Sequence, residues 1–128
     1  MKNTIKIGII SFREHDMKEP SIQFIETLDS TTVLKGLLGG DLKNYDIQRF
    51  KNMDIQLIIA KEPNLEKTTL IVSKEEDENE EIYSNVIFIS TLETSNNSLT
   101  QEQIDFITQN LEVVMNTETK DLVFLIQD

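Results

Sequence analysis

Apolar and polar residues alternate along the first quarter of the chain with the two-residue period of β-strands. Isoleucines at alternate positions fall on one face of residues 4–12, which are therefore predicted to form a strand. Residues 21–28 alternate in the same way and predict a second strand that pairs with the first as a hairpin. A helix over residues 21–28 is the alternative, although the Asp29-Ser30 pair that follows is typical of the start of a helix and not of its middle.

Two helices are predicted. The first follows Asp29-Ser30, where apolar residues recur at helical spacing between positions 33 and 38. Gly39-Gly40 then supplies the stop, and we expect at least one of these glycines to have positive φ. The second helix begins at Thr100, which forms a capping-box pattern with Gln103. Its apolar stripe comprises Ile104, Ile107, Leu111 and Val114, and its polar stripe comprises Glu102, Asp105, Gln109 and Glu112.

Further strands complete the predicted fold, over residues 42–50, 55–61, 68–74, 85–91 and 122–126. The unbroken apolar runs at 86–89 and 122–126 are typical of strands buried on both faces. Because a helix separates these two strands along the chain, we expect them to be parallel neighbours joined by a right-handed crossover. The predicted fold class is α+β, a single domain over residues 1–128 in which a mixed sheet of about seven strands carries two packed helices.

Composition sets limits on this fold and on its setting. The 128 residues suit one domain, and the apolar share of 38% is enough for a core. The sequence has no cysteine, so disulfides, thiolate metal sites and a cysteine nucleophile are excluded. Lys6 and Gly8 interrupt the apolar run near the N-terminus, which indicates a strand and not a signal peptide. No apolar run approaches the roughly 18 residues of a membrane span, and we expect a soluble, cytoplasmic protein with no membrane partner.

Charge is distributed unevenly between the two halves of the chain. Residues 1–64 carry nine basic and nine acidic side chains, whereas residues 65–128 carry three basic and fourteen acidic ones, which accounts for the whole net charge of −11. Six of the carboxylates fall within residues 75–81. Direct binding of nucleic acid is unfavourable, because a phosphate backbone requires clustered Lys and Arg. The acidic half instead predicts a basic protein surface as the partner, for example that of a nucleic-acid-binding protein.

The candidate partner-binding residues combine this acidic run with the polar stripe of the second helix. If the run and the helix lie on the same side of the sheet, their carboxylates form one acidic face. We expect the run to be an exposed, mobile loop, because it has almost no apolar area to bury. The predicted set comprises Glu75, Glu76, Asp77, Glu78, Glu80, Glu81, Glu102, Asp105 and Glu112.

Catalytic and cofactor chemistry finds little support in the sequence. Glycine patterns typical of phosphate or dinucleotide loops are missing, and the single histidine, His15, cannot anchor a metal site alone. If the acidic run were a calcium loop, Ile82 would stand where glycine is needed and Phe88 where a bidentate glutamate is needed. Residues 13–16 form the densest group of potentially catalytic side chains, but they fit an ordinary polar turn. We expect no enzyme activity, no metal and no cofactor.

Two stretches of the chain carry a resemblance to a known family. IQFIE at 22–26 is followed by VLKGLLGGDL at 33–42 and by a predicted strand that ends in Ala60-Lys61-Glu62, and VIFIS at 86–90 is followed by SLTQEQ at 98–103. In this order the segments resemble small uncharacterised domains carried by phages and conjugative elements. The resemblance implies a mobile-element setting and supplies no catalytic residues. The acidic run and a longer C-terminal helix and strand depart from the family pattern.

Three functions fit these observations. The first is a small non-enzymatic inhibitor or decoy of a phage or mobile element, whose acidic half occupies the basic groove of a nucleic-acid-binding host or defence protein. In the second, the acidic residues only keep the protein soluble. The third is a small-molecule or nucleotide-binding protein with a pocket near Arg13 and His15, where Lys18 and Lys35 add anion contacts.

Overall fold

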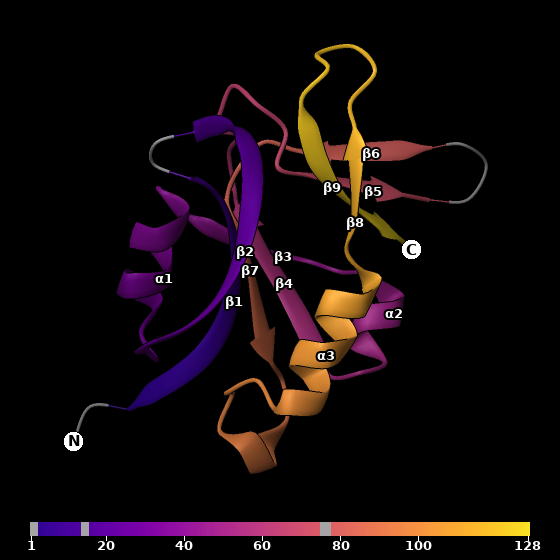
Figure 1. Cartoon of the computed structure of the whole chain (residues 1–128). Coiled ribbons are helices and arrows are strands. Elements are labelled where there is room, and N and C mark those ends of the chain that lie inside the picture. The colour runs from indigo at the N-terminus through magenta and orange to yellow at the C-terminus, as the bar shows by residue number, and fades with distance from the viewer. Residues whose placement is uncertain (1–2, 14–15, 75–77) are drawn as a thin grey trace.

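The computed structural model describes residues 3–13, 16–74 and 78–128, and Figure 1 shows the course of the chain. The strands are β1 (Thr4–Arg13), β2 (Asp16–Leu28), β3 (Leu42–Tyr45), β4 (Ile55–Ala60), β5 (Leu70–Ser73), β6 (Asn79–Ile82), β7 (Val86–Ser90), β8 (Glu112–Met115) and β9 (Leu122–Gln127). The helices are α1 (Thr31–Leu38), α2 (Gln48–Lys51) and α3 (Gln101–Asn110), with a short 3-10 helix η2 (Glu93–Ser95). The α+β class is confirmed, although the strands and helices outnumber the predicted ones and fall into two sheets.

Sheet A contains five strands in the order β2-β1-β7-β4-β3, and each neighbouring pair is antiparallel. The hairpin of β1 and β2 confirms the predicted second strand, so the alternative of a helix over residues 21–28 is wrong. Gly8 of β1 lies opposite both Phe24 and Phe88. A Cβ at this position would come within 3.0 Å of the Phe24 ring, so glycine leaves room for two aromatic rings across the sheet.

Sheet B contains four strands in the order β6-β5-β9-β8, with β5 and β9 parallel and the other pairs antiparallel. The prediction that residues 86–89 and 122–126 form neighbouring parallel strands is therefore wrong, since β7 lies in sheet A and β9 in sheet B. The physical reason is β8. The chain leaves α3 into this additional strand, which pairs with β9 through a hairpin turn and fixes β9 in sheet B.

The layers follow from two groups of buried apolar residues. One group packs α1 against one face of sheet A and includes Leu34, Leu38 and Ile87. The other lies between the opposite face of sheet A and the inner face of sheet B, and includes Phe88 and Phe124. Residues of α2 and α3 close this second group at its side. In the described part of the chain no helix or strand covers the outer face of sheet B, which lies on the side of the molecule away from α1 (Figure 1). Only the end of this face at Val123 is buried, beside residues 66–68 and the turn between β8 and β9.

Local sequence signals explain where the helices begin and end. Gly39 follows α1 with φ of 81°, and its N–H donates to the carbonyl of Lys35 at 2.9 Å, so the predicted left-handed stop is confirmed. The predicted capping box is also confirmed. The Gln103 N–H donates to Thr100 Oγ1 at 3.2 Å, and the Thr100 N–H donates to Gln103 Oε1 at 3.0 Å.

Three other boundaries differ from the prediction. Helix α3 ends at Asn110, so Leu111, Glu112 and Val114 do not lie on helical stripes. The predicted strand 42–50 ends at Tyr45, and the one-turn helix α2 follows it. Part of the acidic run, predicted as a loop, is strand β6, because residues 79–82 complete a hairpin with β5. Glu75, Glu76 and Asp77 lie outside the described residues.

Candidate functional site

The outer face of sheet B brings two of the predicted glutamates into one row of side chains. Glu81 of β6 pairs with Ile71 of β5, Ile71 pairs with Leu125 of β9, and Leu125 pairs with Glu112 of β8. The row therefore crosses the whole sheet, with a carboxylate at each end and two apolar side chains between them. At a strand spacing of about 4.8 Å, the backbones of Glu81 and Glu112 are about 14 Å apart.

Strand alternation explains why this row faces outward. In β5, Leu70 and Val72 are fully buried in the core between the sheets, whereas Ile71 is only partly buried. Because successive side chains of a strand point to opposite faces, Ile71 and its partners Glu81 and Leu125 must point away from that core. The apolar centre of the row is therefore left at the surface by the fold itself, and not by local disorder of the strand.

A shallow cavity of about 430 Å³ lies on this face. Ile71, Val114 and Leu125 supply its apolar lining. Its polar lining includes Glu81 and, from the turn between β8 and β9, Asn116 and Glu118. Apolar surface beside carboxylates suits the side chains of Lys and Arg, because their methylene stems pack on apolar groups while the charged end stays near an acid.

Hydrogen bonds hold the carboxylate of Glu81 in place. It accepts hydrogen bonds from Thr68 Oγ1 at 3.3 Å, from the Tyr83 hydroxyl at 3.2 Å and from Asn116 Nδ2 at 3.3 Å. The Oδ1 atom of Asn116 also accepts from the backbone N–H of Glu118 at 3.0 Å. Asn116 thus links the turn that carries Glu118 to the glutamate at the edge of the cavity. A carboxylate oriented in this way loses little side-chain entropy when it binds a cation.

The lysines of the acidic half leave this row largely uncompensated. Lys67 forms an ion pair with Asp121 at 3.8 Å, and Lys74 forms one with Glu80 at 3.1 Å. Lys120, the third lysine of this half, lies in the turn that carries Glu118, and among the described residues no ion pair joins any of the three lysines to Glu81, Glu112 or Glu118. The outer face of sheet B therefore keeps a net negative charge.

Glu80 has a different role from its neighbour Glu81. It points toward sheet A, where it accepts a hydrogen bond from the Tyr45 hydroxyl of β3 and pairs with Lys74. The hydrogen bond from Tyr45, followed by Lys74, lowers the pKa of Glu80. Burial, followed by the hydrogen bond to Glu80, raises the pKa of Tyr45. Glu80 therefore connects the two sheets, whereas Glu81 lines the cavity on the outer face.

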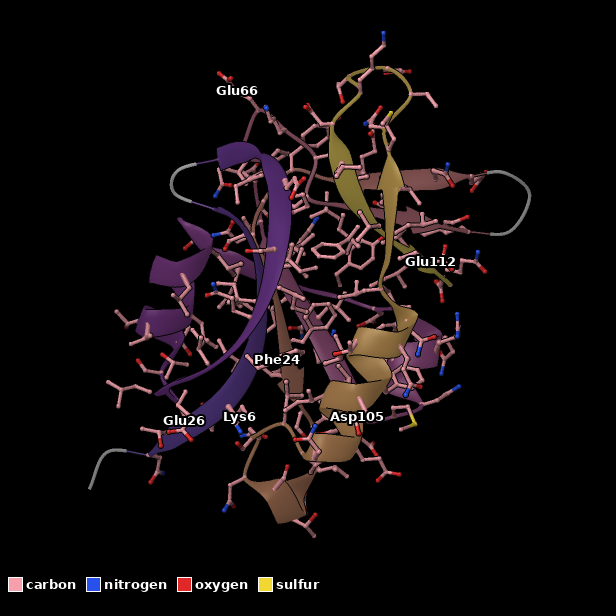
Figure 2. All side chains as sticks on the ribbon, viewed as in Figure 1. Lys6, Phe24, Glu26, Glu66, Asp105 and Glu112 are labelled. Atoms are coloured by element: carbon pink, nitrogen blue, oxygen red, sulfur yellow. The ribbon has the colours of Figure 1, made fainter. Side chains whose placement is uncertain are left out.

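The remaining described members of the predicted set lie apart from the row. Glu78 is exposed at the start of the segment that leads into β6. Glu102 and Asp105 are exposed on α3, where Asp105 accepts a hydrogen bond from Gln101 Nε2 at 2.9 Å. Figure 2 shows Asp105 low on α3 and Glu112 above it, beside sheet B. Neither carboxylate of α3 lines the cavity on sheet B.

Sequence reasoning missed Ile71, Leu125, Asn116 and Glu118. Residues 70–73 alternate in burial, but their sequence, Leu-Ile-Val-Ser, does not alternate between apolar and polar residues, so no local pattern marked Ile71 as an outer residue. Asn116 and Glu118 carried no signal either, since their position depends on the pairing of β8 with β9.

The alternative pocket near Arg13 and His15 stays a prediction, because the side chains of residues 13–18 fall outside the described part of the structure. Lys35, which was expected to contribute there, pairs with Asp41 at 3.4 Å. Within the described residues, no group of three or more His, Cys, Asp or Glu side chains is arranged to hold a metal ion. The same part of the chain contains no helix both long enough and apolar enough to cross a membrane.

No protein-family model matches the chain, and neither a curated protein nor a solved structure matches it. The resemblance to domains of phages and conjugative elements therefore stays a prediction.

Proposed function

We propose that this chain is a non-enzymatic interaction protein that binds a basic surface of another protein through the outer face of sheet B. The observation that carries the proposal is the row from Glu81 through Ile71 and Leu125 to Glu112. In the setting that the sequence resemblance implies, the protein acts as an inhibitor or decoy. It covers the basic groove with which a host or defence protein binds nucleic acid.

The apolar centre of the row favours binding over a purely solubilising role. Carboxylates alone keep a small protein soluble and require no particular neighbours. Here they border partly exposed Ile71 and Leu125, and Glu81 is oriented by three hydrogen bonds. Contact with Lys and Arg side chains would cover the apolar residues with methylene groups and place each charged end beside a carboxylate.

The test removes charge from this face and, in a matched control, from elsewhere. The first variant carries Glu81→Gln, Glu112→Gln and Glu118→Gln. The control carries Glu26→Gln, Glu62→Gln and Glu93→Gln, which remove the same number of charges from exposed sites that do not lie on sheet B. Figure 2 shows Glu26 low on β2, far from sheet B. Each protein is used to capture partners from host lysate at low and at high salt.

The captured partner should be a basic protein, and added nucleic acid should displace it from this chain. The rate at which the two proteins associate should fall steeply as ionic strength rises. The parent and the control should retain it, whereas the first variant should lose most of the association rate. Equal capture by both variants would contradict a role for sheet B and would favour solubility as the function of the acidic half.

A further inference from the structure

Strand β8 is an open edge of sheet B with an unusual surface. It pairs on one side with β9 and ends the order of the sheet on the other. Val113 and Met115 lie at alternate positions on it and are 61% and 60% exposed. They are the large hydrophobic residues that stand exposed in the described part of the chain. An open strand edge combined with exposed apolar side chains is a site where another strand can pair.

The backbone N–H and C=O groups of Val113 and Met115 point away from β9, toward the open side of β8. The N–H of Asn116 donates to the carbonyl of Asp121 at 2.8 Å, which continues the register of β8 with β9. Hydrogen-bonded pairs alternate along antiparallel strands, so Val114 also faces β9, whereas Val113 and Met115 face outward. An independent contact agrees with this assignment. Phe124, the partner of Val113, directs its N–H to the carbonyl of Thr69 on the β5 side, at 3.3 Å.

The other edge of sheet B is protected in a way that β8 is not. Strand β6 carries Glu80 and Glu81 at successive positions, and charged side chains on an edge oppose pairing with a further strand. Between Glu112 and Asn116, β8 carries only Val113, Val114 and Met115, without the lysine, proline or bulge that usually blocks an edge. The two edges thus differ in charge and in exposed apolar surface, since β8 carries one glutamate and the exposed Val113 and Met115.

We propose that β8 accepts an extended basic segment of the partner protein as a fifth strand of sheet B. The inference that the segment is basic rests on the function proposed above. The inference that it pairs as a strand rests on the structure of β8 alone. On one face of the added strand, apolar side chains would contact Val113 and Met115. On the other face, basic side chains would lie beside Glu112 and the turn that carries Glu118. The segment should therefore alternate apolar and basic residues. A second copy of this chain is a poor occupant, because each copy carries a net charge of −11.

The experiment uses a synthetic peptide of alternating lysine and valine and the full chain labelled with ¹⁵N. Binding should slow the exchange of the Val113 and Met115 amide protons and shift their NMR signals. A peptide of alternating glutamate and valine should not bind. A lysine–valine peptide that carries N-methyl groups along one edge should bind much more weakly, because that edge can no longer donate to β8. This last comparison leaves the protein unchanged.

Met115→Pro is the matching change in the protein. Its N–H faces outward, so proline should leave the hydrogen bonds to β9 intact and hold the melting temperature near that of the parent. Loss of this donor should weaken peptide binding by about tenfold. Met115→Lys keeps the backbone N–H donor and adds a positive charge that repels the basic peptide. It should also weaken binding, and this loss should be smaller at high salt.

Several results would overturn the inference. One is salt-dependent peptide binding without protection of Val113 and Met115. This result would leave the proposed function intact and would contradict the addition of a strand to β8. A second is equal binding of the glutamate–valine peptide, which would contradict the inference that the added segment is basic. A third is protection of the same amides on dimer formation without peptide, which would make a second copy the occupant. If the lysine–valine peptide does not bind but the captured basic partner does, strand addition fails while the proposed function stands.

Discussion

Sheet A is covered on both faces, whereas sheet B is covered on one. In β7, at the centre of sheet A, Val86, Ile87 and Phe88 are consecutive and all fully buried. In β5, buried residues alternate with partly exposed ones. The charge of the chain follows this division, because all four strands of sheet B come from the acidic half. On the function proposed above, sheet A provides the stable framework and sheet B presents the surface for binding.

The sharpest test of this division compares one buried and one outer residue. Phe88→Ala should lower the free energy of unfolding by about 3–5 kcal/mol, because Phe88 is fully buried and packs 5.9 Å from the Phe50 ring centroid. Leu125→Ala, on the outer face of sheet B, should lower it by only about 1 kcal/mol. Urea denaturation measures both. Equal losses would mean that the outer face is as much a core as sheet A.

A second test concerns the helix that covers sheet A. Gly39→Ala should destabilise the protein by about 1–2 kcal/mol, because an alanine at φ of 81° is strained. Its new Cβ would also lie 3.1 Å from Asn64 Nδ2, which donates to the carbonyl of Leu38 at 2.7 Å.

Gly40→Ala is the matched control for this change. A Cβ at Gly40 meets no atom within 4 Å, so stability should stay close to that of the parent in thermal unfolding. If both alanine variants melt at the same temperature as the parent, the left-handed turn is not what ends α1.

A third test addresses the contact between the sheets and should have the smallest effect. Tyr45→Phe removes the hydroxyl that donates to Glu80. Because both groups are partly exposed, solvent screening limits the expected loss to about 0.2–1 kcal/mol at neutral pH. The pKa of Glu80 is lowered on folding, so its contribution is present above the ordinary value of 4.5 and is lost as the pH falls below it. The difference between parent and variant should therefore shrink at acid pH.

Denaturation at neutral pH and at about pH 3 measures this difference. The raised pKa of Tyr45 acts at the other end of the scale. The contribution of Tyr45 to the free energy of unfolding is complete below the ordinary pKa of 10.0 and falls as the pH rises above it. Tyr45→Phe should remove this loss of stability at alkaline pH. Tyr83→Phe, which removes a hydroxyl that bonds Glu81 within sheet B, controls for the loss of a hydroxyl alone. A Tyr45→Phe difference that is constant across the pH range would contradict the contact with an ionised Glu80.

Sequence patterns identified the elements whose signal is local. The capping box of α3 and the glycine after α1 depend on neighbouring residues, and both lie where they were predicted. The continuous apolar run of β7 also indicated burial on both faces correctly. Such signals describe each element by itself, and they do not determine which strands become neighbours.

The errors arose where tertiary pairing overrides the local pattern. Leu111 and Val114 continue the helical spacing of α3, yet the β-branched pair Val113-Val114 lies in a strand that β9 stabilises. No apolar run in the sequence predicts strand β6, which forms through pairing with β5. The site shares this limit. Glu81 and Glu112 stood out by charge, but their alignment with Ile71 and Leu125 depends on three strand registers that no local pattern encodes.

The position of β9 has a consequence for the order of events during synthesis. All five strands of sheet A lie within the first 90 residues, so they can pair while the chain is still being made. Sheet B must wait, because β9 inserts between β5 and β8 and is translated after both. Until residues 122–127 leave the ribosome, sheet B is incomplete, and the inner face of sheet A, which carries Phe24 and Phe88, stays partly open to water. A nascent chain paused before this point would be a natural substrate for chaperones.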